Sequence, residues 1–151
     1  MEFIIIILGI ILDRITKIWA LKYLALGNNV IIIPNFFAFS YLENRGAAFG
    51  ILQNKLLFLV VITLIVLIGI VYYILKYKPT SNLLRIGLAF VISGAIGNLI
   101  DRVMYGFVVD FILLHYKNVY YFPTFNIADM LVSLGALLLA IYLIKEEIHG
   151  K

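Results

Sequence analysis

Four long apolar stretches constrain this chain more than any other feature of its 151 residues. They lie at residues 3–21, 56–75, 83–100 and 128–144. Each is close to the roughly 20 residues with which an α-helix crosses about 30 Å of hydrocarbon. Because unpaired backbone groups are too costly in lipid, we expect each stretch to be helical. The pattern predicts a membrane protein, an all-α bundle of four transmembrane helices forming one domain over residues 1–151.

The composition agrees with a lipid environment. Hydrophobic residues make up 64% of the chain, against roughly 45–50% in soluble domains, and charged residues 13%, against roughly 25%. A water-soluble domain of this size cannot bury so much apolar surface, because most of its residues contact solvent. The net charge of +4 would suggest nucleic acid in a soluble protein. In a membrane protein the position of the positive charges matters more, and we expect no nucleic-acid partner.

The distribution of Lys and Arg predicts the orientation. The short link at residues 76–82 and the C-terminal tail carry lysines, whereas the long connections at 22–55 and 101–127 are sparser in positive charge. The positive-inside rule then puts both termini in the cytoplasm and both long connections outside. Three basic residues at the outer end of the first stretch oppose this orientation: Arg14, Lys17 and Lys22.

A cleaved signal peptide is the alternative for the first stretch. Its apolar core, residues 3–12, has a suitable length. The leading segment, however, holds Glu2 and no Lys or Arg, and no convincing small-x-small cleavage site follows. This pattern favours a retained helix.

The outer connections contain strand-like segments. Residues 30–33 and 36–42 are β-branched and aromatic, with Pro34 and Asn35 between them, which predicts two strands and a turn. Residues 119–125 are a candidate for a further strand. Aromatic side chains suit the headgroup layer, so we expect a small β platform on the outer membrane surface.

Ionisable and amide side chains near the bilayer are costly and therefore point to a functional site. In the first cluster, Asp13 and Lys17 are four residues apart on one helix face, although a plain ion pair explains them equally well. The second cluster, residues 43–50, contains Asn44 and Gly46, and a tight turn into a helix is its favoured explanation.

The third cluster, residues 93–102, combines helix packing with polar groups. Ser93 and Gly97 suit close helix packing. Packing does not explain the remaining three polar side chains, which are Asn98, Asp101 and Arg102. Asn98 lies within the apolar layer and therefore needs a hydrogen-bond partner.

The last two clusters each contain an aspartate near the outer interface. Asp110 is isolated among apolar residues, and Asp129 lies one turn after Asn126 at the start of the fourth stretch. A position at a helix N-terminus explains either Asn126 or Asp129 alone. It explains the presence of both residues less well. The chain can return and set Asp110 and Asp129 face to face. Adjacent carboxylates share one proton, so one can act as general base on water and the other as general acid.

Together the five clusters resemble those of the bacterial lipoprotein signal peptidases, also called signal peptidase II. The resemblance covers nearly the whole chain and rests on the order and spacing of five segments: Asp13 with Thr16 and Lys17, Asn44–Phe49, Gly94–Arg102, Val108–Phe111, and Phe125–Asp129. The departures are small. The family often has Gly-Gly at Ser93-Gly94 and Ser or Thr at Met130.

The resemblance implies a four-helix bundle with an extracytoplasmic β-cradle in the bacterial inner membrane. It implies a metal-free and cofactor-free aspartic peptidase with Asp110 and Asp129 as its dyad. The substrates would be prolipoproteins whose lipobox cysteine carries diacylglyceryl, cut just before that cysteine, and globomycin would inhibit. We expect a monomer in contact with membrane lipids. The supporting residues would be Asp13, Lys17, Asn44, Gly46, Asn98, Asp101, Arg102 and Asn126.

Three other kinds of membrane protein fit the sequence less well. A proton- or ion-coupled transporter also carries buried carboxylates, but it more often shows repeated halves or helices broken at the midplane. A serine peptidase would need Ser93 and His115 in contact, and nothing in the sequence brings them together. A metallopeptidase is disfavoured because there is no His-Glu-x-x-His, and the absence of cysteine excludes thiolate chemistry.

Overall fold

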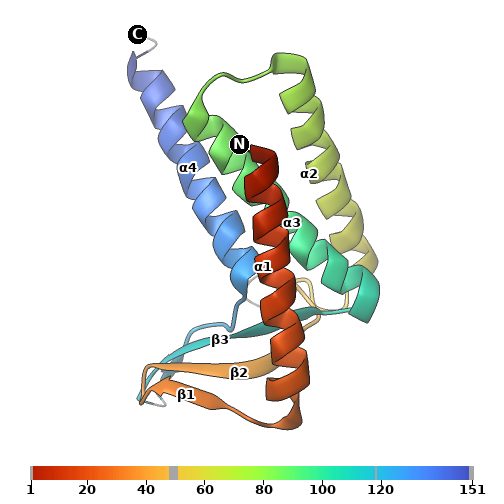
Figure 1. Cartoon of the computed structure of the whole chain (residues 1–151), viewed down its shortest axis with the longest axis vertical. Coiled ribbons are helices and arrows are strands. Elements are labelled where there is room, and N and C mark those ends of the chain that lie inside the picture. The colour runs from red at the N-terminus through yellow and green to blue at the C-terminus, as the bar shows by residue number, and fades with distance from the viewer. Residues whose placement is uncertain (1, 48–50, 118, 150–151) are drawn as a thin grey trace.

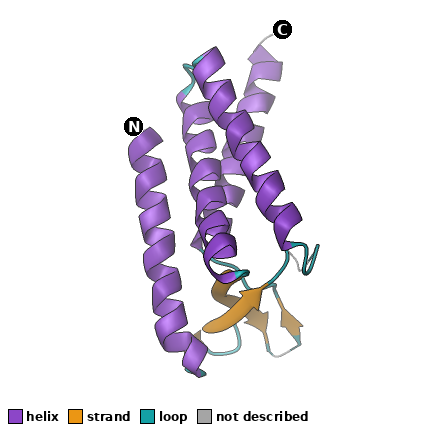
Figure 2. Cartoon of the chain, turned by 90° about the vertical axis from the view of Figure 1, so that its right-hand side faces the viewer, coloured by secondary structure: helices purple, strands orange, loops and turns teal. Residues whose placement is uncertain are grey.

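The computed structural model describes residues 2–47, 51–117 and 119–149. Four long helices run alongside one another and a small sheet lies at one end of them (Figure 1). They are α1 (Glu2–Tyr23), α2 (Leu56–Tyr77), α3 (Asn82–Tyr105) and α4 (Ile127–His149). The start of α1 and the end of α4 both lie away from the sheet (Figures 1 and 2). A short 3₁₀ helix, η1 (Leu24–Leu26), continues from α1.

The four apolar stretches each lie within one helix, but the helices differ in polarity. Among the described residues, α2, α3 and α4 are long and apolar enough to cross a membrane. The helix α1 is not in this set, since it carries Asp13, Arg14 and Lys17 within its length. The fold is therefore mostly helical, with three apolar helices of membrane-spanning length and a small antiparallel sheet.

The helix α3 continues five residues beyond the predicted end at residue 100. It stops at Tyr105 because Gly106 adopts a left-handed conformation (φ 79°) and donates its backbone N–H to the carbonyl of Arg102. Gly106 is the first residue after the apolar stretch that takes this helix-ending conformation without strain. Asp101 and Arg102 were predicted to lie in the connection at residues 101–127, but they lie on the helix α3.

The sheet contains four antiparallel strands in the order β1-β2-β3-β4. Their bounds are β1 (Val30–Ile33), β2 (Phe37–Asn44), β3 (Val108–Tyr116) and β4 (Tyr120–Tyr121). The two strands predicted at residues 30–33 and 36–42 are confirmed, and the candidate at 119–125 contributes the short β4 and an antiparallel bridge from Phe125 to Ile112. The long β3 was not predicted. Its first five residues are all buried, so it lacks the alternation of a half-exposed strand.

A β-bulge interrupts the pairing of β2 with β3. Between the pairs Phe39–Ile112 and Leu42–Asp110, β2 has two residues and β3 has one. The extra residue shifts the pairing register of β2 relative to β3 by one position. Asn44 consequently pairs with Val108 and lies diagonally across from Asp110, a distance at which side chains meet.

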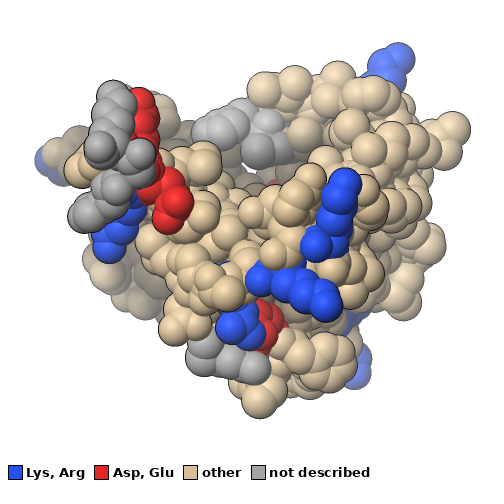
Figure 3. Space-filling model, turned by 90° about the horizontal axis from the view of Figure 1, so that it is seen from above, with Lys and Arg blue, Asp and Glu red and all other residues tan. Residues whose placement is uncertain are grey.

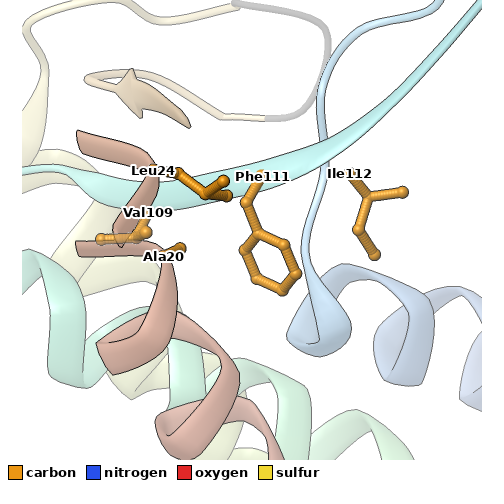
Figure 4. Packing of buried hydrophobic residues seen from close by; sticks show 5 residues of the cluster. All are labelled: Ala20, Leu24, Val109, Phe111 and Ile112. Atoms are coloured by element: carbon orange, nitrogen blue, oxygen red, sulfur yellow. The ribbon is translucent and has the colours of Figure 1, made fainter. Parts of the chain in front are cut away.

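A compact apolar cluster attaches the sheet to the bundle where α1 ends. Ala20 and Leu24, at the end of α1, form one buried cluster with Val109, Phe111 and Ile112 of β3 (Figure 4). All but Ile112 are at most 2% exposed. Aromatic rings extend the cluster, since the Trp19 ring centroid lies 5.4 Å from that of Phe39 and 6.2 Å from that of Phe111. This packing fixes β3, and with it Asp110, against α1.

The helices α3 and α4 approach each other closely at Gly94. A Cβ atom there would overlap the carbonyl oxygen of Ala128 and lie 2.7 Å from Cγ2 of Val132. The backbone of α4 cannot move aside as a flexible side chain could, so the two helices would have to separate. The glycine thus fixes how close the start of α4, which carries Asp129, lies to α3.

We expect Gly94→Ala to lower the free energy of unfolding by about 1–3 kcal/mol, the usual cost of overpacking a core. Thermal or chemical unfolding of the full chain in detergent micelles measures the change. Gly69→Ala on α2 is the matched control, because a Cβ at that position would have no neighbour within 4 Å. An equal effect of the two substitutions would contradict close packing at Gly94.

Candidate active site

Asp110 and Asp129 come from different elements and meet around Asn126. Asp110 is fully buried on β3, and Asp129 is the third residue of α4. The side-chain Nδ2 of Asn126 donates to Oδ1 of Asp110 at 2.6 Å. The backbone N–H of Asn126 donates to Oδ2 of Asp129 at 3.2 Å. One residue therefore contacts both carboxylates, which lie on either side of it.

The carboxyl group of Asp110 accepts hydrogen bonds from two amides whose orientation is fixed. Oδ1 of Asn126 accepts from the backbone N–H of Asp129 at 2.9 Å, and Oδ1 of Asn44 accepts from the backbone N–H of Gly46 at 2.9 Å. A backbone N–H can only donate, so in each side chain the NH₂ group must point the other way. Both NH₂ groups point at Asp110, that of Asn44 at 2.9 Å from Oδ2.

The amide of Asn98 is oriented in the same manner toward Asp129. Its Oδ1 accepts from the ammonium of Lys17 at 2.9 Å and from Nδ2 of Asn126 at 3.3 Å. An ammonium has no acceptor atom, so the amide oxygen must face it. The NH₂ group of Asn98 then donates to Oδ1 of Asp129 at 2.7 Å.

The pKa of Asp110 is raised from 3.8 to about 7, mainly by burial and secondly by the negative charge of Asp129. The hydrogen bonds from Asn44 and Asn126 and the charge of Lys17 lower the pKa and only partly offset these effects. A carboxyl group with this pKa exchanges its proton near neutral pH, as a group that transfers protons must.

A second set of charged groups lies beside the two aspartates and is completely buried. Lys17 forms ion pairs with Asp13 (2.9 Å) and Asp101 (3.0 Å), and all three side chains are 0% exposed. The ion pair of Asp13 and Lys17 was predicted from their spacing. Arg14 also pairs with Asp101 and donates to the hydroxyl of Tyr105 at 3.1 Å. Arg14 was expected only as a charge that opposes the predicted orientation, although its place beside Asp13 was a signal for a role in this network.

A groove of about 330 Å³ between α2, α3 and α4 leads to Asp129. Its surface is mainly apolar, although five of its ten lining residues are polar. The residues are Ile62, Thr63, Val66, Val91, Ala95, Asn98, Arg102, Asp129, Val132 and Ser133. Arg102 also donates to the backbone carbonyl of Gly46 at 3.1 Å, which ties the segment after β2 to α3.

The residues of the serine-peptidase alternative are not brought together. The hydroxyl of Ser93 donates to the carbonyl of Ile6 at 3.2 Å inside the helix bundle. His115 stacks on Tyr121 in the sheet, with ring centroids 5.4 Å apart. The other predicted site residues all belong to the network described above. Ala48, Phe49 and Gly50, the end of the second cluster, lie outside the described residues.

Buried carboxylates beside an apolar groove in a bundle of membrane-spanning length point to the membrane-embedded aspartic peptidases. Comparison with known proteins gives the family. A family model described as Signal peptidase (SPase) II matches residues 5–145. The chain belongs to the signal peptidase II family.

The relatives and the solved structures agree with this membership. The chain is 64% identical to a lipoprotein signal peptidase of Clostridium novyi, over 97% of this chain and 99% of that protein. It is 58% identical to a lipoprotein signal peptidase of Clostridium tetani, over 97% of this chain and 94% of that protein. A bacterial membrane enzyme solved at 2.3 Å resolution has a TM-score of 0.88 and 36% identity, covering 99% of this chain and 91% of that one. A second, solved at 1.9 Å, has a TM-score of 0.84 and 37% identity, covering 96% and 93%.

Family membership confirms the predicted activity. The chain is an aspartic-type peptidase that removes signal peptides from prolipoproteins. The transporter alternative receives no support from these relatives.

Proposed function

We propose that this chain cleaves diacylglyceryl-modified prolipoproteins immediately before the modified cysteine, with Asp110 and Asp129 as the catalytic dyad. The observation that carries the proposal is the meeting of the two carboxylates around Asn126, which contacts both. Two acids from a strand and a helix in one buried polar site have the arrangement that aspartic peptidases need.

The two carboxyl groups take different roles in the proposed reaction. Asp129 lies in the first turn of α4, where the free N–H groups of the helix favour a negative charge, so it is the base. It removes a proton from water as the water oxygen attacks the scissile carbonyl carbon. Asp110 donates its proton to the carbonyl oxygen and gives a neutral tetrahedral diol. As the C–N bond breaks, the leaving nitrogen takes the proton from Asp129, and Asp110 regains its own from the diol.

Four membrane spans with cytoplasmic termini are part of the proposal. Charged residues in α1 would prevent it from crossing the membrane only if they faced lipid. Asp13 and Lys17 are 0% exposed, so they do not face lipid. Lys and Arg side chains, with a few Asp and Glu side chains, show on the end of the bundle away from the sheet (Figure 3). Lys76 lies in the last turn of α2, and Lys78 directly follows that helix. This supports a cytoplasmic location for that end and an outer location for the sheet.

The substrate enters the proposed site from the side, through the groove between α2, α3 and α4. The mainly apolar surface of the groove suits a signal helix or an acyl chain, and Asp129 and Arg102 are among its polar lining residues. Described residues of one chain supply α1, α3, α4, β2 and β3 to the site, which supports a monomeric enzyme.

Cleavage by the purified full chain tests the proposed substrate. The probes are one prolipoprotein segment with diacylglyceryl on its cysteine and the same segment without it. We expect the cut before the cysteine, and a kcat/KM at least about 10²-fold lower without the lipid, because each buried CH₂ contributes about 0.8 kcal/mol. Globomycin should inhibit the reaction. Equal cleavage of the two segments would contradict lipid recognition.

A further inference from the structure

Lys17 connects two carboxylates that each hold a particular backbone N–H group. Its ammonium pairs with Oδ2 of Asp13 at 2.9 Å and with Oδ2 of Asp101 at 3.0 Å. Oδ1 of Asp13 accepts from the N–H of Ala128 at 2.9 Å. Oδ2 of Asp101 accepts from the N–H of Val109 at 3.0 Å. The chain Ala128–Asp13–Lys17–Asp101–Val109, here called the lysine clamp, is thus continuous through five residues.

The two ends of the lysine clamp lie next to the two dyad aspartates. Val109 immediately precedes Asp110 on β3, and Ala128 immediately precedes Asp129 on α4. The backbone N–H of the residue just before each dyad aspartate is therefore hydrogen-bonded to a buried carboxylate. Since Lys17 pairs with both acids, one ammonium group links the two backbone positions.

The third contact of the ammonium acts on a side chain of the site. Lys17 donates to Oδ1 of Asn98 at 2.9 Å, which turns the NH₂ group of Asn98 toward Asp129. Without the ammonium, nothing among the described contacts would prevent Asn98 from presenting its oxygen to Asp129, apart from the longer bond from Asn126.

We propose that Lys17 is a positioning residue that sets the spacing of the catalytic dyad through the lysine clamp. The proposal rests on the dyad assigned above. Lys17 transfers no proton and contacts no substrate. The two acids that it joins would repel each other without it, and in a fully buried site water cannot screen this repulsion.

The test compares Lys17→Met with Lys22→Met, an exposed lysine in the last turn of the same helix. Both are made in the full chain and purified in detergent, and kcat and KM are measured with the diacylglyceryl-modified segment. Lys17→Met should lower kcat by about 10²-fold, the effect of a misplacement near 1 Å, with KM unchanged. NMR hydrogen exchange should become about tenfold faster at the amides of Val109 and Ala128. Lys22→Met should change none of these values.

A second variant covers the case in which Lys17→Met does not fold. The double variant Lys17→Met/Asp13→Asn removes one charge of each sign and keeps the size of both side chains. Its kcat should stay about 10- to 100-fold low, because the bridge between the acids is still missing. Recovery of kcat to the level of the Lys22→Met control would mean that Lys17 only balances charge, and would overturn the proposal.

The exchange rates separate this proposal from the assignment of the dyad. Unchanged exchange at both amides in the folded Lys17→Met chain would overturn the lysine clamp, whatever the activity. Full activity of Asp110→Asn would instead overturn the dyad, and faster exchange in Lys17→Met would still show that the clamp exists.

Discussion

Asp110→Asn and Asp129→Asn should each lower the rate of prolipoprotein cleavage by about 10⁴-fold, the upper range of a general acid–base contribution. An amide has the size of the carboxyl group but can neither take a proton from water nor supply one to the carbonyl oxygen. Single-turnover cleavage of a diacylglyceryl-modified segment measures the loss. Both variants should still insert and purify as the unaltered chain does, since the remaining contacts of α3 with α4 and of β2 with β3 are intact.

Glu43→Gln is the matched control for this pair of substitutions. Glu43 also lies on the sheet, but its side chain is 39% exposed and pairs with Arg45 at 2.7 Å, away from the dyad. It should retain full activity. Normal cleavage by either single dyad variant would refute the catalytic assignment, because an aspartic mechanism needs both groups.

The stability of the unaltered chain should fall as pH rises from about 4 to about 7, and Asp110→Asn should make this fall smaller. The pKa of Asp110 is raised from 3.8 to about 7 in the folded protein, first by burial and then by the charge of Asp129. The folded chain therefore holds a proton that the unfolded chain releases at lower pH. The stabilisation is fully present below the unfolded value and is lost as pH rises through the folded value.

The expected size of this effect is about 2–4 kcal/mol between pH near 4 and pH near 8, from about 1.4 kcal/mol for each unit of pKa difference. The free energy of unfolding in detergent is measured at the two pH values for the unaltered chain and for Asp110→Asn. The effect is the change with pH in the unaltered chain minus the change in the variant. Glu147→Gln, at an exposed position of α4, controls for the loss of one acid. The same pH dependence in all three chains would contradict a raised pKa at Asp110.

The sequence predicted the elements whose patterns are local. Apolar stretches of membrane length gave the helices, and the β-branched segment 30–33 gave β1. The candidate acids were recognisable because Asp110 stands alone among apolar residues and Asp129 follows Asn126 by one turn. The family, and with it the peptidase activity, followed from the order of these residues and was confirmed by the comparisons.

The features that the sequence did not reveal depend on contacts between distant segments. β3 is buried at Val108–Ile112, so its pattern does not distinguish it from other apolar segments. The pair Asp13 and Lys17 was visible as a spacing of four, whereas the contact of Lys17 with Asp101 joins positions on different helices. No local pattern encodes such a contact, nor the hydrogen bonds from Val109 and Ala128 to the two acids.

The bulge in β2 decides which side chain approaches Asp110. If all the residues of β2 were kept and paired regularly from Phe39–Ile112 with no bulge, Glu43 would pair with Val108 in place of Asn44. A third acid would then stand diagonally across from Asp110 and repel its ionised form. The insertion instead supplies a neutral donor there. A backbone irregularity three to four residues before Asn44 thus determines the charge of the side chain that lies diagonally across from Asp110.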